Sequence, residues 1–163
     1  MERSLLLRLG WSDFYAVAFQ IDAVAEVGSS VLMHRILIAD DSATIRKMVR
    51  ASLQGLDHAE FIEAGTGLQA IEQLALATVQ LVVLDLNMPD MHGIDVLRFL
   101  RRHQHYRDLP VIILTTRGDD ASRATAIEAG ATTYMTKPFT PQTLAATART
   151  LLTGAATPTG LER

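Results

Sequence analysis

The sequence predicts an α/β fold with a parallel sheet covered by helices on both faces. From Arg35 onward, short apolar runs alternate with segments of helical periodicity. Runs such as LVVL (81–84) contain no polar alternation, which is typical of strands buried on both faces. Five such runs, each followed by a helical segment, indicate parallel pairing through right-handed crossovers.

The first two strand–helix units are expected within residues 35–76. RILIA (35–39) is the first strand, and apolar residues recur at helical spacing from Ile45 to Leu56, with Gly55 near the end of that helix. EFIEA (60–64) is the second strand. Leu68, Ile71 and Leu74 then mark the second helix.

Three further units follow. LVVL (81–84) precedes a helix marked by Ile94, Leu97 and Leu100, and PVIILT (110–115) precedes a helix from about Asp120 to Ala129 that Gly130 ends. TTYM (132–135) is the fifth strand. Thr140 is the expected N-cap of the last helix, with Pro141 at its first helical position and its end near Leu152.

The alternation places one domain at residues 33–152. Residues 1–32 are expected to be an extension, either helical or disordered, because Phe14, Val17, Ile21 and Val24 share a helical face but lie outside the strand–helix pattern. Met33 stands directly before the first strand, so we expect the domain not to need this extension. Residues 153–163 are rich in small and turn residues and are expected to be disordered.

The composition argues against several classes of function. Fifteen basic and 18 acidic residues give a net charge of −3, which does not favour nucleic-acid binding. The absence of cysteine excludes disulfides, thiolate catalysis and cysteine-based zinc sites, and it fits a cytoplasmic protein. No apolar run reaches the roughly 20 residues of a membrane-spanning helix, so membrane insertion is not expected.

Polar residues stand at the carboxyl ends of the predicted strands, where ligands bind in open parallel sheets. They are Asp40 and Asp41, Asp85, Thr115 and Thr116, and the Lys137–Pro138 pair. Taken singly, each acid is more simply read as a solvated turn or helix cap. Together, three carboxylates at one sheet edge repel one another unless a cation lies among them. A divalent cation held by oxygen ligands, such as Mg²⁺, fits that arrangement and leaves positions for phosphate oxygens.

These residues, within the segments DDSATIRKMV, DLNMPDMHGID and KPFT, resemble the receiver domain of two-component response regulators. The match is most like the single-domain CheY-type chemotaxis regulators, and its spacing is that expected of the family without insertions. The resemblance implies a five-stranded sheet in the order 2-1-3-4-5, doubly wound by five helices.

The resemblance also implies roles for the site residues. Asp85 would accept a phosphoryl group from a histidine kinase, next to Mg²⁺ held by Asp40, Asp41, Asp85 and the backbone carbonyl of Asn87. Lys137 would bridge to Asp85 and then to the phosphoryl oxygens. The Thr115 hydroxyl and the Thr116 amide would contact the phosphoryl group, and the bond before Pro138 is expected to be cis.

The implied output is a switch in affinity for a partner protein. Thr115 would move toward phosphorylated Asp85, and Tyr134 would turn inward into the space it leaves. The helix near 120–129, the fifth strand and the last helix would form the binding face of a monomer. That helix has one large apolar residue, Ile127, among alanines, so its position could change at small free-energy cost.

Other functions remain open. A phosphorelay shuttle or a kinase-linked adaptor would use the same residues, and a pseudo-receiver would bind partners without phosphate. A phosphatase of the haloacid dehalogenase type needs a second carboxylate two residues after the nucleophile, where Asn87 stands. We therefore expect a phosphoacceptor and not a dedicated enzyme. Arg117 could bind a leaving phosphate or obstruct a phosphatase, while His103 and His105 are expected to be surface residues.

Overall fold

A computed structural model describes residues 33–154, so the expected extension at 1–32 and nearly all of the expected tail lie outside the described residues. The described chain forms one five-stranded sheet with the order β2-β1-β3-β4-β5. Its strands are β1 (His34–Ala39), β2 (Ala59–Ala64), β3 (Leu81–Leu84), β4 (Val111–Thr115) and β5 (Thr133–Thr136). All four pairings are parallel, which confirms the expected fold class and strand order.

The register brings the carboxyl ends of the strands to one edge. Ala39 at the end of β1 lies opposite Leu84 at the end of β3, and Thr115 at the end of β4 lies opposite Thr136 at the end of β5. The residues that follow β1, β3 and β5 therefore emerge beside one another. This alignment turns acids and a lysine that are distant in sequence into neighbours.

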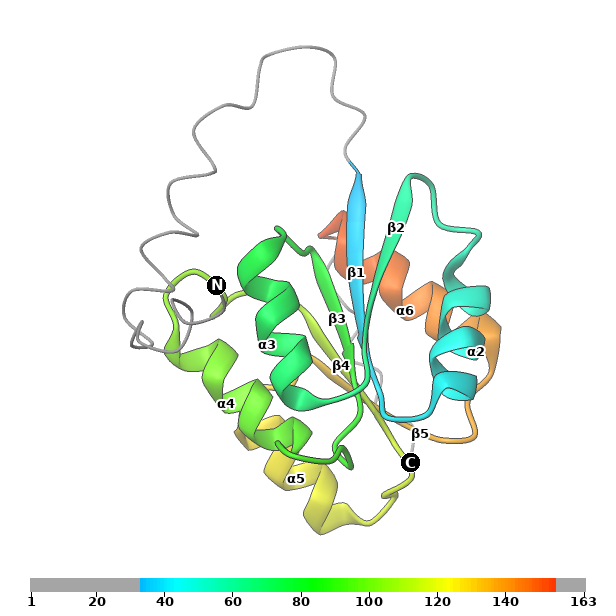
Figure 1. The fold of residues 1–163 in the computed structure, drawn as a ribbon. Helices are drawn as coiled ribbons and strands as arrows, with labels where there is room; N and C mark the ends of the chain where they lie inside the picture. Colours follow the sequence, from blue (N-terminus) through cyan, green and yellow to red (C-terminus); the bar gives the residue numbers. More distant parts are fainter. Residues whose placement is uncertain (1–32, 155–163) are drawn as a thin grey trace, which may run out of the picture. The chain divides into compact units, whose positions relative to one another are not determined.

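Helices cover both faces of the sheet (Figure 1). They are α2 (Ala43–Leu53), α3 (Gly67–Leu76), α4 (Gly93–Arg102), α5 (Asp120–Glu128) and α6 (Pro141–Thr153). Helices α3, α4 and α5 lie on one face, and α2 and α6 lie on the other. None of the helices in residues 33–154 is long and apolar enough to cross a membrane.

Alternate side chains of each central strand supply the two halves of the core. In β1, Ile36 and Ile38 belong to the cluster beneath α2 and α6, whereas Leu37 and Ala39 belong to the cluster beneath α3, α4 and α5. This is the alternation of side chains along a pleated strand. Because both faces are covered, the strand needs apolar residues at every position, as the sequence pattern indicated.

The helix ends agree closely with the sequence signals. Thr140 caps α6 by accepting a hydrogen bond from the Thr143 amide, and Pro141 begins the helix, as predicted. Gly130 follows α5 with φ 101°, a conformation that glycine adopts without strain. Helix α2 ends at Leu53, three residues earlier than the apolar pattern indicated, although Leu56 remains buried.

Helix α5 is held differently from what its sequence indicated. Ile127, the one large apolar residue of the helix, is 47% exposed, and the small Ala126 is the buried residue. Ile127 therefore does not anchor α5. The helix has even less buried apolar surface than its composition had indicated.

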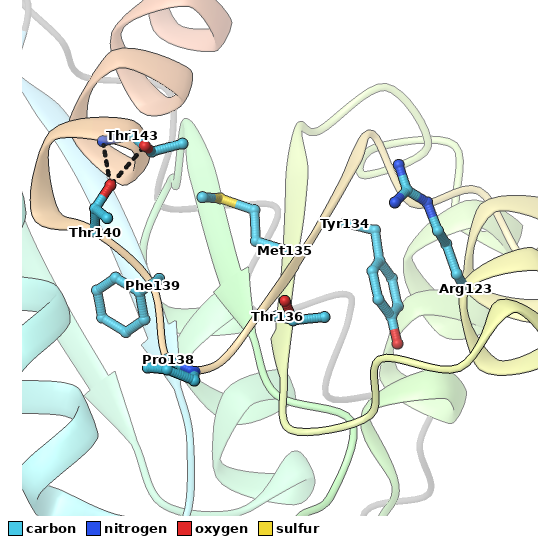
Figure 2. Close-up of a pocket in the computed structure, with 8 residues that line it drawn as sticks. All are labelled: Arg123, Tyr134, Met135, Thr136, Pro138, Phe139, Thr140 and Thr143. Atoms are coloured by element: carbon cyan, nitrogen blue, oxygen red, sulfur yellow. Dashed lines mark hydrogen bonds between the residues drawn. The ribbon is translucent and has the colours of Figure 1, made fainter. Parts of the chain in front are cut away.

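A pocket of about 300 Å³ opens at the β5 edge of the sheet (Figure 2). It is lined by Arg123 of α5, by Tyr134, Met135 and Thr136 of β5, and by Pro138, Phe139, Thr140 and Thr143 at the start of α6. The pocket thus joins the three elements that the sequence analysis assigned to the output face. Its lining combines aromatic rings, hydroxyls and one guanidinium.

Candidate functional site

Asp40 follows β1 and is almost fully buried at 3% exposure. Its amide donates to the Ala64 carbonyl of β2 at 3.1 Å, so the sheet hydrogen bonding holds its backbone. One carboxylate oxygen accepts from the Ser42 amide at 2.8 Å, and the other contacts Lys137 Nζ at 2.5 Å. Every polar atom of the Asp40 carboxylate therefore has a partner within the protein.

Asp85 follows β3 and is 5% exposed, and its amide donates to the Ala39 carbonyl at 2.8 Å. Its Oδ2 lies 3.4 Å from Lys137 Nζ. Its Oδ1 is buried and has no hydrogen-bond partner among the described residues. Burial raises the pKa of the Asp85 carboxyl, while the Lys137 ammonium acts in the opposite direction. A buried acceptor oxygen without a donor is costly, which is typical of a site built for a ligand.

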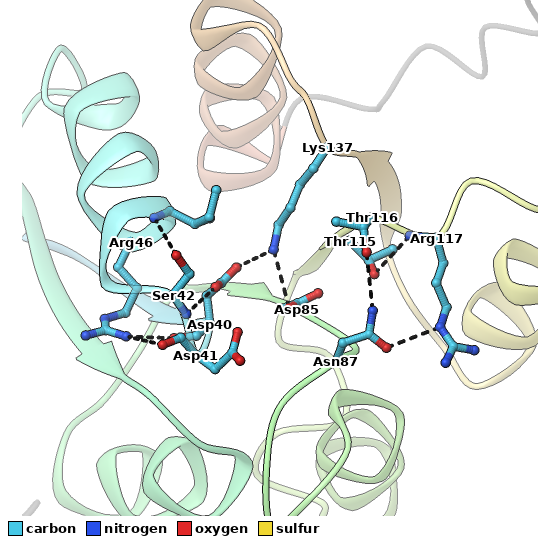
Figure 3. A network of polar contacts seen from close by, with 11 residues as sticks. Asp40, Asp41, Ser42, Arg46, Asp85, Asn87, Thr115, Thr116, Arg117 and Lys137 are labelled. Carbon is cyan, nitrogen blue, oxygen red and sulfur yellow. Dashed lines mark hydrogen bonds and ion pairs between the residues drawn. The ribbon is translucent and has the colours of Figure 1, made fainter.

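Lys137 follows β5 and extends between the two acids (Figure 3). Its side chain is 10% exposed, and its amide donates to the Thr115 carbonyl at 2.8 Å. The Lys137–Pro138 peptide bond is cis. The shorter ion pair is to Asp40, so the ammonium leaves Asp85 only partly neutralised.

The three acids fit a divalent cation. Asp40, Asp41 and Asp85 each place a carboxylate oxygen within 4.8 Å of the others. Asp41 is exposed and the other two are buried, so the cluster is open to solvent on one side. Hard oxygen donors with open positions, together with the unpartnered Asp85 Oδ1, match the preferences of Mg²⁺.

The loop after Asp85 packs against the site without space for a side chain at Gly93. A Cβ atom on Gly93 would lie 2.0 Å from the Asp85 carbonyl oxygen, and the Gly93 amide donates to the Leu86 carbonyl at 3.0 Å. Gly93 belongs to the segment DLNMPDMHGID, but only the fold shows that it lies against the Asp85 backbone. The glycine keeps α4 close to the carboxyl end of β3.

Thr115 and Thr116 lie on the far side of Asp85, and here the structure adds contacts that sequence reasoning missed. The fully buried Thr115 Oγ accepts from the Arg117 amide at 3.4 Å. The Asn87 side chain donates to Thr116 Oγ at 3.4 Å and accepts from Arg117 Nε at 3.2 Å. Asn87 and Arg117 are thirty residues apart in sequence, and no local signal predicts their contact.

Tyr134 already points inward. Its ring is 8% exposed, and its hydroxyl donates to the Arg117 carbonyl at 2.6 Å. The sequence analysis expected the ring to turn inward only after phosphorylation. The Arg117 backbone accepts from Tyr134 and donates to Thr115, so it connects the two expected switch residues.

A sequence profile of response regulator receiver domains matches residues 36–149, most of the described chain. The chain belongs to the response regulator receiver family. The fold described above and the placement of Asp85 at the end of β3 agree with this assignment. Membership in a two-component family implies a histidine kinase and an output protein as partners.

This receiver domain is similar to several CheY-type chemotaxis regulators. It is 38% identical to chemotaxis protein CheY1 of Helicobacter pylori over 111 residues, which cover 68% of this chain and 90% of that protein. It is also 38% identical to CheY-3 of Vibrio cholerae, over 68% of this chain and 85% of that protein. The solved structure of Vibrio cholerae CheY4 matches with a TM-score of 0.68 and 32% identity, covering 74% of this chain and 99% of that one.

Proposed function

We propose that this receiver domain is a phosphorylation-dependent switch that accepts a phosphoryl group on Asp85 from a histidine kinase and changes its affinity for a partner protein. The observation that carries the proposal is the Asp85 carboxylate. It is buried beside Lys137 and Asp40, and its Oδ1 has no hydrogen-bond partner among the described residues. A reactive oxygen in this position could attack phosphorus without first breaking a hydrogen bond within the protein.

The transfer would form one bond and break another. An Asp85 oxygen attacks the phosphorus of a kinase phosphohistidine, the P–N bond breaks, and the imidazole leaves with its electron pair. Lys137 would offset negative charge on the phosphoryl oxygens. Asp40, Asp41, Asp85 and the Asn87 carbonyl would hold Mg²⁺, which when bound supplies further positive charge to those oxygens.

Thr115 and Thr116 would bind the transferred group from the β4 side. To donate its hydroxyl to a phosphoryl oxygen, Thr115 would rotate, and the Arg117 amide would lose the acceptor that it has in this structure. Because the Arg117 carbonyl also binds the Tyr134 hydroxyl, the same backbone unit would transmit the change to β5. This coupling supports a route from Asp85 to the pocket of α5, β5 and α6.

That pocket is the candidate output surface. The weak packing of α5 supports a change in pocket shape, because Ala126 is the buried residue of that helix. The phosphorelay shuttle and the kinase-linked adaptor use the same chemistry and stay as alternatives. Asn87 supports a switch over a phosphatase, because its amide neither releases nor accepts a proton at neutral pH and so cannot act as the general acid or base that a phosphatase of this type needs.

The test uses beryllofluoride, which mimics a phosphoryl group on aspartate, and amide NMR shifts across residues 111–153. We expect shifts in wild type at β4, α5, β5 and α6, and none in Asp85→Asn. In Thr115→Ala, the mimic should still bind near Asp85, but the shifts at β5 and α6 should shrink strongly.

Thr153→Ala is the matched control, since the Thr153 hydroxyl bonds within its own helix. In this variant, the shift changes caused by beryllofluoride should equal those of wild type. Undiminished shifts at β5 in Thr115→Ala would contradict the coupling. Failure of wild type to bind beryllofluoride or to accept phosphate from acetyl phosphate would contradict the phosphoacceptor itself. Light scattering with and without the mimic checks the expected monomer.

A further inference from the structure

Arg46 binds the backbone of Asp40 and Asp41 from the side opposite Lys137 (Figure 3). Its Nη1 donates to the Asp40 carbonyl oxygen at 2.8 Å and lies 3.5 Å from the Asp41 carbonyl oxygen. The guanidinium therefore contacts the main chain of the metal-binding loop and not its carboxylates. In residues 33–154, no other side chain binds either carbonyl oxygen.

Glu63 of β2 orients this guanidinium. Arg46 Nε donates to Glu63 Oε2 at 2.9 Å, and the Arg46 side chain is only 18% exposed. A guanidinium is a planar fork with fixed donor directions. Because Nε is paired with Glu63, Nη1 is directed at the carbonyl oxygens of Asp40 and Asp41.

Asp41 needs such support more than the other two acids. In the part of the chain that the structure describes, the carboxylates of Asp40 and Asp85 both pair with Lys137, but no side chain forms a hydrogen bond or ion pair with the Asp41 carboxylate. Repulsion from the other two acids favours moving Asp41 away into solvent. Only its backbone keeps its carboxylate within 4.8 Å of the others, and Arg46 binds that backbone.

We propose that Arg46, oriented by Glu63, is a positioning residue that holds the Asp40–Asp41 backbone so that Asp41 presents its carboxylate to the divalent cation. The proposal rests on the metal site of the proposed function. It assigns a role in that site to an ion pair on the outer side of the loop, between β2 and the first turn of α2. Groups that orient metal ligands from behind commonly change metal affinity by about 10–100-fold when removed.

The sign of the effect separates positioning from simple electrostatics. If Arg46 acted only as a nearby positive charge, removing it would tighten Mg²⁺ binding, because one repulsive cation would be gone. If Arg46 positions Asp41, removing it should weaken Mg²⁺ binding. The two accounts therefore predict opposite changes in the dissociation constant.

The experiment measures the Mg²⁺ dissociation constant by calorimetry on the full chain, together with thermal unfolding in EDTA. We expect Arg46→Gln to raise the dissociation constant about tenfold, and Glu63→Gln to raise it less. Arg46→Lys should fall between Arg46→Gln and wild type, because it keeps the charge but loses the fork.

Arg35→Gln is the matched control. Arg35 of β1 pairs with Glu60 of β2 at 2.8 Å, and within residues 33–154 its side chain forms no hydrogen bond with the Asp40–Asp41 backbone, which Arg46 binds. Its removal should therefore leave the Mg²⁺ dissociation constant unchanged. Should Arg46→Gln fail to fold, Arg46→Lys carries the test. It keeps the positive charge, so simple electrostatics predicts no change in Mg²⁺ binding, whereas loss of the planar fork predicts weaker binding.

Unchanged or tighter Mg²⁺ binding in folded Arg46→Gln, or in folded Arg46→Lys if the former does not fold, would overturn the proposal. A different result would overturn the metal site on which it depends: no Mg²⁺ binding by wild type, or equal binding by wild type and Asp41→Ala. The two failures are thus distinguishable.

Discussion

The placement of the Asp85 carboxylate destabilises its charged form in the folded protein. The carboxylate is buried, faces Asp40, and leaves one oxygen without a partner among the described residues. Each of these features destabilises the charged form in the folded protein. A group of this kind persists where a ligand or a reaction requires it, and this gives the proposed phosphoacceptor its physical basis.

The raised pKa of Asp85 predicts how stability depends on pH. Burial is its main cause, so the folded protein holds the Asp85 proton more tightly than the unfolded chain does. The resulting stabilisation is complete below the ordinary pKa of 3.8 and is lost as the pH rises through the higher folded-state value. In EDTA, Asp85→Asn should therefore unfold at a higher temperature than wild type at neutral pH, and this advantage should shrink toward pH 4.

Thermal unfolding at several pH values measures this difference. Asp95→Asn is a suitable control, because Asp95 is half exposed on α4 and pairs with the equally exposed Arg98. It should produce no comparable stabilisation at neutral pH. A lower melting temperature for Asp85→Asn at neutral pH would show that the Lys137 ion pair outweighs the cost of burial.

At the scale of elements, α4 and α5 pack on the same face of the sheet but with different strength. Helix α4 buries Val96, Leu97 and Leu100, whereas α5 buries Ala126. Arg101 of α4 donates to the Gly130 carbonyl at 2.9 Å, which fixes the end of α5. The beginning of α5 is capped by Asp119, which accepts from the Ser122 amide, and it follows the loop that begins at Arg117. We therefore expect any shift of the helix to be larger at the end nearest Thr115.

Paired truncations measure this contrast. Leu97→Ala should lower the free energy of unfolding by about 2–5 kcal/mol, because it opens a cavity in the core. Ile127→Ala should cost less than about 0.5 kcal/mol, as expected for an exposed position. Chemical denaturation gives both values, and amide hydrogen exchange should be faster in α5 than in α4. Equal costs for the two variants would contradict the weak anchoring of α5.

At the scale of the whole molecule, the site depends on both halves of the core. Helices α2 and α6 cover one face of the sheet and α3, α4 and α5 cover the other, while Asp40, Asp85 and Lys137 all emerge from the edge between them. The domain limits at 33 and 152 stay a prediction.

A chain beginning at Met33 checks those limits. We expect it to fold with an unfolding free energy close to that of the full chain and to bind beryllofluoride with similar affinity, because every described site residue follows Met33. The measurements are chemical denaturation and beryllofluoride titration of the two chains. A loss of more than about 1 kcal/mol, the size of one ordinary interaction, would show that residues 1–32 contribute to the domain.

Much of the fold could be predicted from the sequence because a parallel sheet covered on both faces imposes strong local patterns. Unbroken apolar runs such as LVVL, helical spacing, and the Thr140–Pro141 start signal each reflect a constraint that acts within a few residues. The acids and Lys137 could be grouped for the same reason, since each stands at the end of a recognisable strand.

The remaining features depend on contacts between residues distant in sequence, which no local pattern encodes. Only the tertiary structure shows that Ile127 is exposed, that Tyr134 already points inward onto the Arg117 carbonyl, and that Arg46 binds the backbone of the acidic pair. Such contacts follow from how whole elements are placed against one another. The local periodicity is the same whether Tyr134 points inward or outward, so the sequence pattern by itself does not decide between the two orientations.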